Sequence, residues 1–496
     1  MRPQRILNCI LWIFFIGISL HIILYLLIPI FFNDENFENN YLGVNRDVKE
    51  LKTDQINLRL SLIDKLRTQF IEIFNFNPSP NEGPVLLERK RNRNFKQNNT
   101  YPISSIFNRN IELMNASNLL RLLHQINSEQ IILNLDLFPN PEFAIVIQIH
   151  NRLEYLTILI NSLINVKDIH KSLLIFSHDM YFPEFNKIIR SIRFAPLVQI
   201  FFPFNQQIFK SEFPGYNSKD CDVDMKKKNS QLKNCFNANW SDSYGNYRNY
   251  KYTQTKHHWS WKAHFVFDRL RFLEIFQNPI VFIEEDHYLT EDFLHVLRLM
   301  LSERKKKYPQ VSIICLGTYE KVHSFNPSSK IQIGAWLSSF HNMGMTFDRS
   351  VWTKIKKCVK EFCEFDDYNW DWSLQHVHKR CLKEEFQVML LKNSPRIFHI
   401  GECGIHHKNK VCNPYVVLYK IQRLLSQNRQ YLYPDEMIYM GATTTRSKEF
   451  HPNGGWSDLR DRNLCKVLFN NSQLLDNLTS LESSNGHLSV LESFLI

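Results

Sequence analysis

Three acidic residues stand together at the end of an apolar run. Glu284, Glu285 and Asp286 follow residues 279–283, PIVFI, a run typical of a buried, parallel strand. Ligands of open α/β sheets bind beyond the carboxyl ends of such strands. Carboxylates there suit a hard divalent cation, which prefers oxygen ligands and can bridge substrate phosphates. The alternative is an acidic turn exposed to solvent, and the run alone favours neither.

A second polar group follows another apolar run. Residues 143–149, FAIVIQI, predict a buried strand, and the polar residues Gln148, His150, Asn151 and Arg152 stand at its end. No glycine-rich loop follows this strand. A P-loop enzyme or a dinucleotide-binding enzyme is therefore not indicated.

The elements around these residues alternate in type. Further strands are predicted at 172–177, 198–202 and 311–316, and helices at 153–164, 185–193, 259–276 and 290–304. Strands that alternate with helices predict an α/β fold, in which helices flank a mostly parallel sheet. The polar residues at the strand ends then meet at one edge of that sheet.

The N-terminal segment is typical of a membrane anchor. Residues 6–32 carry no charged side chain, and this run exceeds the roughly 20 residues needed to span a bilayer. Arg2 and Arg5 precede it, so the positive-inside rule places residues 1–5 in the cytosol and the remainder across the membrane. A cleaved signal peptide would have a shorter apolar core and a small-residue cleavage site. We predict a retained transmembrane signal-anchor.

Cysteines and sequons agree with a lumenal location. Nine cysteines follow the anchor, and an oxidising lumen would pair most of them. Asn-x-Ser/Thr sequons begin at Asn98, Asn115, Asn239, Asn470 and Asn477. Paired CxxC motifs do not occur, which argues against a zinc site.

Composition divides the chain and excludes one class of partner. Residues 33–135 include a stretch with several prolines and a basic run, which predicts a stem. We assign residues 136–465 to a catalytic domain and residues 466–496 to a C-terminal tail. The formal net charge of +11 is spread along the chain. A nucleic-acid-binding protein would carry basic patches interleaved with aromatic residues in the nucleus or cytosol, and the predicted anchor argues against that class of partner.

Seven short segments, in order over about residues 140–465, resemble a known family. They are QIHNR at 148–152, FSHD at 176–179, QTKHHW at 254–259, EEDH at 284–287, HNMG at 341–344, YNWDW at 368–372 and FH at 398–399. The chain resembles the N-acetylglucosaminyltransferase II family of the Golgi. The resemblance implies a glycosyltransferase-A-type, Rossmann-like fold on a single-pass type II Golgi membrane protein. It implies inverting transfer of GlcNAc from UDP-GlcNAc to the 2-hydroxyl of the α1,6-linked mannose of N-glycans, with Mn²⁺.

The resemblance also implies roles for individual residues. Asp371 matches the catalytic base, which takes the proton of the acceptor hydroxyl. The metal carboxylate is Asp286, and the resemblance adds His399 as the second protein ligand; Mn²⁺ accepts both oxygen and nitrogen ligands. Asn342 matches an acceptor-side position. Donor-binding segments of the family match Gln148, Ile149, His150, Asn151, Arg152, Asp179, Gln254, Thr255, Lys256, His257 and His258. Among these, the candidates to offset the diphosphate charge are Arg152, Lys256 and His257.

The resemblance also implies a set of disulfides, and this chain has the cysteines for all of these pairs except one. The family pairing would join Cys221 to Cys235, Cys358 to Cys381, Cys363 to Cys465 and Cys403 to Cys412. The family has a further short-range bridge, for which this chain has Tyr308 and Val311 near the two positions. Cys315 lies within a predicted strand and is expected to be a buried free thiol.

Two other function classes stay open at this point. One is a related β-GlcNAc-transferase that uses the same donor and a different acceptor, decided by the loops at 221–252 and around Asn342. The other is an inactive, lectin-like protein of the secretory pathway, against which the intact Asp286, Asp371 and His399 count. A homo-oligomer is compatible with either reading.

Overall fold

The computed structural model describes residues 114–382, 386–401, 413–443 and 451–470. The predicted anchor at 6–32, most of the stem and most of the C-terminal tail lie outside these residues. No helix in the described ranges is both long enough and apolar enough to cross a membrane.

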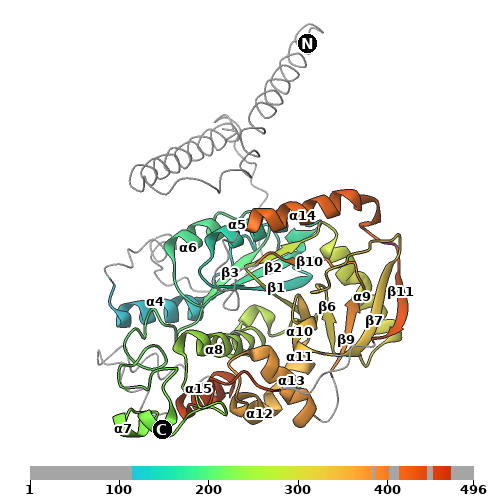
Figure 1. Cartoon of the computed structure of the whole chain (residues 1–496). Helices are drawn as coiled ribbons and strands as arrows, with labels where there is room; N and C mark the ends of the chain where they lie inside the picture. Colours follow the sequence, from blue (N-terminus) through green and yellow to red (C-terminus); the bar gives the residue numbers. More distant parts are fainter. Residues whose placement is uncertain (1–113, 383–385, 402–412, 444–450, 471–496) are drawn as a thin grey trace, which may run out of the picture. The chain divides into compact units, whose positions relative to one another are not determined.

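A nine-stranded sheet forms the centre of the described part (Figure 1). Its strands are, in sheet order, β11 (Met437–Ala442), β7 (Ser329–Ala335), β9 (Gln387–Leu391), β6 (Ile313–Cys315), β8 (Met345–Phe347), β4 (Ile280–Glu284), β1 (Phe143–Ile149), β2 (Ser172–His178) and β3 (Leu197–Phe201). The pairs β4–β1, β1–β2 and β2–β3 are parallel, as are β6–β9 and β11–β7. The strand β8 is antiparallel to both neighbours, and β7 is antiparallel to β9. The mostly parallel α/β sheet that the sequence predicts is confirmed.

Helices cover both faces of this sheet. In chain order they are α5 (Leu153–Asn165), α6 (Pro183–Arg190), α8 (Tyr250–His264), α9 (Phe293–Lys307), α10 (Ser338–His341), α11 (Arg349–Lys357), α12 (Val359–Glu364), α13 (Trp370–Arg380), α14 (Pro414–Gln427) and α15 (Leu459–Asn470). The short α7 (Lys227–Lys233) lies in a loop. Figure 1 shows α5, α6 and α14 on one side of the strands and α8, α12, α13 and α15 on the other.

Side chains of β1 alternate between the two layers. Ile145 and Ile147 belong to the core that contains α5 and α9, whereas Ala144 and Val146 belong to the core that contains α8 and α11. Because both faces are buried, the strand is apolar along its whole length instead of alternating. This is why its bounds could be predicted without error.

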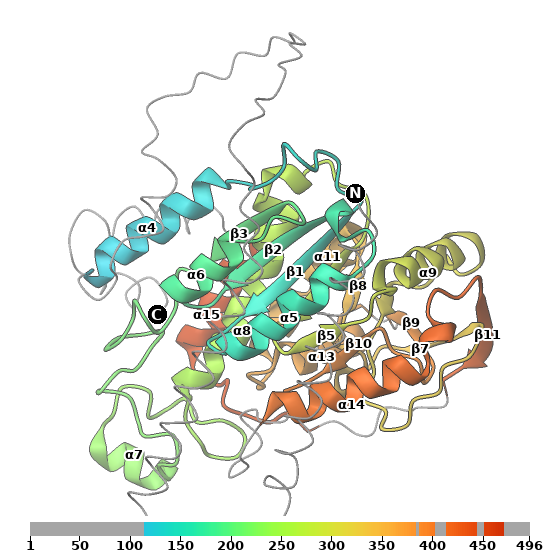
Figure 2. The ribbon, with the colours of Figure 1, turned by 90° about the horizontal axis from the view of Figure 1, so that it is seen from above.

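The folded part begins earlier than predicted. The helix α4 (Ala116–Glu129) lies in the segment assigned to the stem, yet Leu119 and Leu123 on it are buried in the core. Asn127 exchanges hydrogen bonds with the backbone of Phe201 at 2.7 and 2.8 Å, which places α4 beside the edge strand β3 (Figure 2). The stem boundary at residue 135 is therefore wrong for these residues.

The helix predicted at 259–276 is also placed wrongly. Instead, α8 begins at Tyr250, ends at His264 and continues as a π-helical turn, Phe265–Arg269. Nearly every side chain between Thr253 and His264 is buried, polar ones included. A helix buried all round shows no apolar stripe, so its register cannot be read from hydrophobic periodicity.

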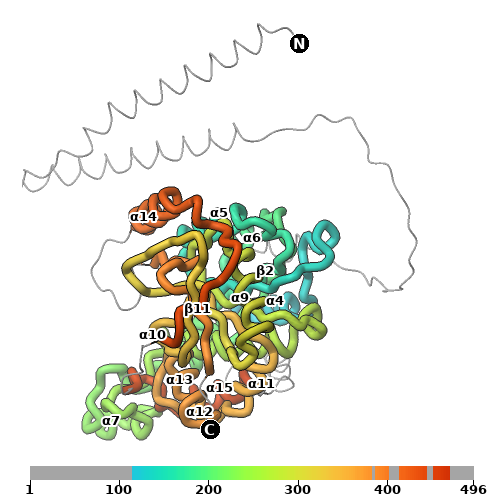
Figure 3. The backbone as a smooth tube through the Cα atoms, turned by 90° about the vertical axis from the view of Figure 1, so that its right-hand side faces the viewer, coloured from blue at the N-terminus to red at the C-terminus, as the bar shows by residue number. Residues whose placement is uncertain are grey.

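Two disulfides join the helices on the α8 side. Cys358–Cys381 links the end of α11 to the end of α13, and Cys363–Cys465 links α12 to α15. Figure 3 shows these helices gathered in one layer. Both pairs, and Cys221–Cys235, agree with the predicted connectivity; Cys403 and Cys412 lie outside the described residues.

Candidate active site

A cavity of about 370 Å³ lies at the carboxyl ends of β1, β2 and β4. It is lined by Gln148, His150, Arg152, Asp179, Lys251, Gln254, Thr255, His258, Glu284 and Asp286. In the sheet, β2 and β3 lie on one side of β1, and β4 lies on its other side. Ligands of open α/β sheets bind where the strand order reverses in this way.

Unpartnered polar atoms mark this cavity as a binding site. The Oδ1 atoms of Asp179 and Asp286 and the Nδ1 of His258 are buried without a hydrogen-bond partner among the described residues. Such atoms are rare in folded proteins, because each one carries an uncompensated desolvation cost. A polar ligand in the cavity would satisfy them.

The three acidic residues at the end of β4 have two different surroundings. Glu285 is 1% exposed and Asp286 3% exposed, so the alternative of a solvent-exposed acidic turn is wrong. Glu285 accepts hydrogen bonds from the backbone N–H of His150 and from Nε of Arg152, at 2.8 and 2.7 Å. Glu285 thereby fixes the loop after β1, while Glu284 and Asp286 line the cavity.

Asp286 and His399 meet although they are far apart in sequence. The small sheet formed by β5 (His287–Leu289) and β10 (Ile397–His399) pairs His287 with His399 in antiparallel register. Nε2 of His399 lies 3.2 Å from Oδ2 of Asp286, and Nη1 of Arg152 lies 2.9 Å from the same oxygen. Burial raises the pKa of Asp286, but the hydrogen bond and charge of His399 and the charge of Arg152 outweigh it and lower this pKa.

These residues fit a metal such as Mn²⁺. A buried carboxylate with one unpartnered oxygen stands beside an imidazole nitrogen, a mixed oxygen and nitrogen donor set that Mn²⁺ accepts. Gly401 packs against both groups: a Cβ there would lie 2.2 Å from Oδ2 of Asp286 and 3.1 Å from Nε2 of His399. The backbone approaches the pair closely only because this residue has no side chain.

One face of α8 forms a wall of the cavity. Lys251, Gln254, Thr255 and His258 line it, and their spacing of three and four residues places them on one helix face. Burial and the charge of Lys262 lower the pKa of His258, so its imidazole is neutral at neutral pH. The face offers a cation, an amide, a hydroxyl and a neutral imidazole to a ligand.

Lys256 and His257 occupy the opposite face of α8. Nζ of Lys256 donates to the carbonyls of Phe365 and Asp367, and Nε2 of His257 lies 3.1 Å from the carbonyl of Asp461. Both side chains are buried and neither lines the cavity. The expectation that they offset the diphosphate charge is wrong for this geometry, because a helix turns adjacent residues away from each other by about 100°.

Two further residues of the predicted donor segments do not contribute side chains to the cavity. Ile149 is fully buried in the core and its carbonyl accepts the backbone N–H of Asp179 at 3.1 Å. Asn151 is exposed at the surface. The alternation of side chains in a strand explains why Gln148 faces the cavity while Ile149 does not.

The predicted base and the predicted acceptor residue lie together. Asp371 stands in the first turn of α13, where Oδ1 accepts the backbone N–H of Trp372 at 2.9 Å and Oδ2 accepts Nδ2 of Asn342 at 3.1 Å. Burial and the charges of Asp367 and Glu284 raise the pKa of Asp371 to about 7, against the effect of these two hydrogen bonds. A carboxyl group with a pKa near neutrality is well suited to accept a proton.

Tyr319 and Lys262 belong to this site but were not predicted. Burial raises the pKa of the Tyr319 hydroxyl, and the charges of Glu284, Asp371 and Asp286 raise it further. Its ring centroid lies 6.1 Å from that of His399. Nζ of Lys262 donates to Oε1 of Gln148, and its position four residues after His258 was the available signal.

Comparison with known proteins decides the family. The model of the N-acetylglucosaminyltransferase II (MGAT2) family matches residues 120–465. This chain belongs to that family. The proteins named alpha-1,6-mannosyl-glycoprotein 2-beta-N-acetylglucosaminyltransferase from Rattus norvegicus and Homo sapiens are 42% and 41% identical over 354 and 350 residues. These alignments cover 70% of this chain and 79% and 78% of the two relatives. The protein of that name from Arabidopsis thaliana is 32% identical over 67% of this chain and 76% of its own length.

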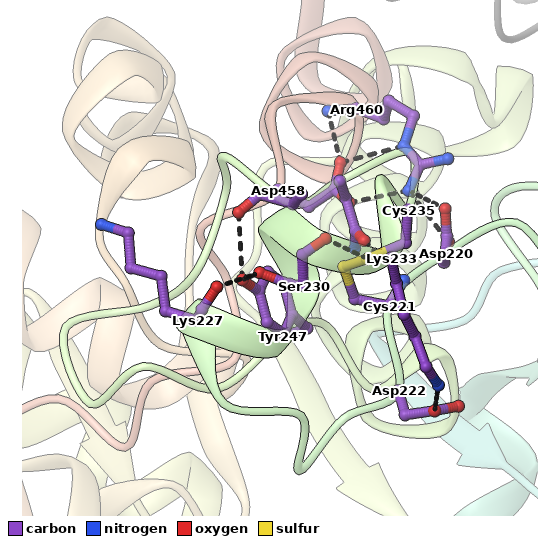
Figure 4. Close-up of a disulfide and its surroundings, with 12 residues drawn as sticks. Asp220, Cys221, Asp222, Lys227, Ser230, Lys233, Cys235, Tyr247, Asp458 and Arg460 are labelled. Carbon is purple, nitrogen blue, oxygen red and sulfur yellow. Dashed lines mark hydrogen bonds and ion pairs between the residues drawn. A yellow bond between two sulfur atoms is a disulfide. The ribbon is translucent and has the colours of Figure 1, made fainter.

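Within this member of the MGAT2 family, the loop between β3 and α8 is held by charge as well as by a disulfide. Arg460 on α15 is fully buried and donates to Asp220 and Asp458, at distances of 2.7 to 3.0 Å. Figure 4 shows Arg460 above the Cys221–Cys235 bridge, with Asp220 and Asp458 on either side. Breaking such a buried ion pair from one side is costly, so the loop is fixed to α15.

Cys315 departs from the family's disulfide set as expected. It is buried and unbridged, and its thiol donates to the carbonyls of Gly317 and Met343. Burial raises its pKa to about 12, so the reactive thiolate is absent at neutral pH. The prediction of a buried free thiol is confirmed.

Proposed function

We propose that this protein transfers GlcNAc from UDP-GlcNAc to the 2-hydroxyl of the α1,6-linked mannose of N-glycans, with inversion to a β1,2 linkage. Membership of the MGAT2 family over residues 120–465 carries this proposal. It is supported by Asp371, whose pKa is raised in part by the charge of Glu284 in the lining of the cavity. The finer fold assignment, a glycosyltransferase-A-type fold, is part of the same proposal.

The donor would occupy the cavity at the ends of β1, β2 and β4. Asp179, Gln254, Thr255 and His258 present groups for the nucleotide, and Arg152 and Lys251 supply positive charge. A diphosphate has a high desolvation cost, which oriented donors and cations in a half-enclosed cavity can offset. The unpartnered atoms of this cavity support a polar ligand of this kind.

Asp286 and His399 would hold Mn²⁺. When bound, this cation offsets the negative charge that develops on the departing diphosphate. The chain's own contribution is to hold a carboxylate and an imidazole 3.2 Å apart at the end of β10, where Gly401 has no side chain that would collide with either group.

Asp371 would take the proton of the acceptor hydroxyl. A sugar hydroxyl is a weak nucleophile, so a base must accept its proton as the new bond forms. Nδ2 of Asn342 and the N–H of Trp372 orient the two carboxylate oxygens. One displacement at the sugar needs one base, and no glycosyl-enzyme intermediate forms.

The site would work in the Golgi lumen. This part of the proposal rests on the apolar segment at 6–32, the basic residues before it and the disulfides of the described part. Oxidising compartments are where such disulfides persist. A single-pass type II membrane protein with a lumenal catalytic domain meets these requirements.

The test is a transfer assay with the full-length protein, UDP-GlcNAc and Mn²⁺. One acceptor carries GlcNAc on the α1,3 arm and a free α1,6-linked mannose, and a matched acceptor lacks that mannose. We expect a product only with the first acceptor and a β1,2 linkage by linkage analysis. Transfer to another position would indicate the related transferase, and UDP binding without transfer to either acceptor would contradict the proposed activity.

A further inference from the structure

Lys256 is a buried lysine that the proposed chemistry does not use, and burial lowers the pKa of its side chain well below the ordinary value. Its side chain is fully buried on the face of α8 that points away from the donor cavity. Its ammonium nitrogen lies 4.3 Å from the ring centroid of Trp456 and 5.2 Å from that of Phe362. Burying a lysine carries a large desolvation cost, so its contacts must compensate for it.

Those contacts are to the loop that leads into α13. Nζ of Lys256 donates to the carbonyl of Phe365 at 3.2 Å and to that of Asp367 at 2.9 Å. Asp367 in turn accepts the backbone N–H of Asn369 at 2.8 Å, and Asn369 is the residue before the first turn of α13. Lys256 is thus connected to the N-terminus of α13 through residues 365–369.

A second contact joins α8 to the same turn. The rings of Trp259 and Trp370 stack with centroids 4.8 Å apart and an interplanar angle of 3°. Trp370 precedes Asp371 directly. Since Trp259 lies three residues after Lys256, one face of α8 holds both the loop and the first turn of α13.

We propose that Lys256 is a positioning residue that acts through residues 365–369 to set the place of Asp371 relative to the donor cavity. The opposite face of α8 lines that cavity with Gln254 and His258. A single rigid helix therefore fixes the distance between the donor and the base. This inference rests on the proposed function, because it assigns the base role to Asp371.

Loss of the ammonium should loosen this loop without unfolding it. The carbonyl of Phe365 also accepts the backbone N–H of Asp367 at 2.7 Å. The carboxylate of Asp367 keeps the N–H of Asn453 at 2.8 Å. These contacts remain when Lys256 is replaced, so the protein keeps its fold while Asp371 gains freedom.

The experiment compares Lys256→Met, Lys256→Arg and Lys356→Met in the full-length protein. Met keeps the length and apolar stem of lysine but has no donor, whereas Arg restores a cation that can donate to two carbonyls. Lys356 on α11 is the matched control, since its ammonium pairs with Asp268 at 3.0 Å instead of with residues 365–369. The measured quantities are kcat, KM for UDP-GlcNAc and the Kd and stoichiometry of UDP with Mn²⁺.

We expect Lys256→Met to lower kcat about tenfold to hundredfold when kcat is calculated from the concentration of sites that bind UDP. Small misplacements of catalytic groups have effects of this size. In Lys256→Met, the Kd of UDP and the KM for UDP-GlcNAc should stay within about twofold of the wild-type values. Lys256→Arg should recover part of kcat, and Lys356→Met should match the wild type. An unchanged kcat in Lys256→Met, a parallel loss of UDP affinity or no recovery with Arg would overturn the inference. Absence of transfer by the wild-type protein would instead refute the proposed function.

Discussion

At the scale of single residues, two buried carboxyl groups have pKa values that are shifted in opposite directions, because their charged neighbours differ. Asp286 is buried beside His399 and Arg152, and its pKa is lowered. Burial raises the pKa of Asp371 to about 7, and the charges of Asp367 and Glu284 act in the same direction. Two carboxyl groups whose pKa values are driven apart suit different roles, which agrees with the proposed roles of Asp286 as a metal ligand and Asp371 as a base.

Replacement of Asp371 by Asn should lower kcat by about a hundredfold or more, because an amide cannot accept the acceptor proton. Binding of UDP with Mn²⁺ should stay near normal, since those contacts lie at the cavity and at Asp286. Kinetics and calorimetry on the same preparation measure both. Near-normal turnover would move the base role to Glu285, Asp366 or Asp367.

The pH profile should report the same residue. A base with a pKa of about 7 is protonated below neutrality and cannot accept a proton there. We therefore expect kcat at saturating donor and Mn²⁺ to rise with pH up to about 7 and to level off above it, in contrast to a carboxyl with the ordinary pKa of about 4. A plateau that extends down to pH 5 would contradict the raised pKa of Asp371.

At the scale of elements, the pairing of β5 with β10 brings together Asp286 and His399, the proposed metal ligands. The antiparallel register sets His287 opposite His399, and Gly401 follows two residues later. This antiparallel pairing brings the end of β10 beside Asp286, the residue directly before β5. The donor set is therefore a property of strand pairing and not of any local motif.

Substitution of Gly401 by Ala tests this arrangement. The new Cβ would lie 2.2 Å from Oδ2 of Asp286, so the carboxylate must move. We expect the Mn²⁺ concentration for half-maximal activity to rise about tenfold or more, as for other changes that disturb the orientation of metal ligands. Asp286→Asn is the reference and should lose most activity at any Mn²⁺ concentration. An unchanged Mn²⁺ requirement in Gly401→Ala would show that the metal lies elsewhere.

At the scale of the whole molecule, the α8 side of the sheet is closed by long-range cross-links. Cys363 and Cys465 are separated by 102 positions, whereas Cys221 and Cys235 are separated by 14. A cross-link stabilises mainly by restricting the unfolded chain, and more so for a longer loop. The C-terminal α15 is thereby fixed to α12 in the layer that holds Asp371.

The double substitution of Cys363 and Cys465 by Ser should lower the free energy of unfolding by about 5 kcal/mol, against about 3 kcal/mol for the Cys221 and Cys235 pair. Urea denaturation of the two variants under non-reducing conditions measures the difference. A larger loss for the Cys221–Cys235 variant would contradict the loop-length argument.

The sequence alone was sufficient to predict the bounds of a strand that is buried on both faces. The strand at 143–149 was predicted with its correct bounds because both of its faces are buried, which makes the apolar run continuous. The acidic residues after β4 and the polar ones after β1 were expected to meet for the same reason, since the ends of neighbouring parallel strands share one edge. Family resemblance supplied Asp371 and His399, which no local pattern indicates.

Only the tertiary structure decided what each face of α8 does. In the sequence, residues 254–258 form one polar segment, and all of them were assigned to the donor. The structure divides them: Gln254, Thr255 and His258 line the cavity, whereas Lys256 and His257 contact α15 and the loop before α13. Helical periodicity states which residues share a face, but which neighbour covers that face depends on packing between elements distant in the chain. The same reason kept Tyr319 out of the predicted site and the contacts of Arg460 out of the predicted fold.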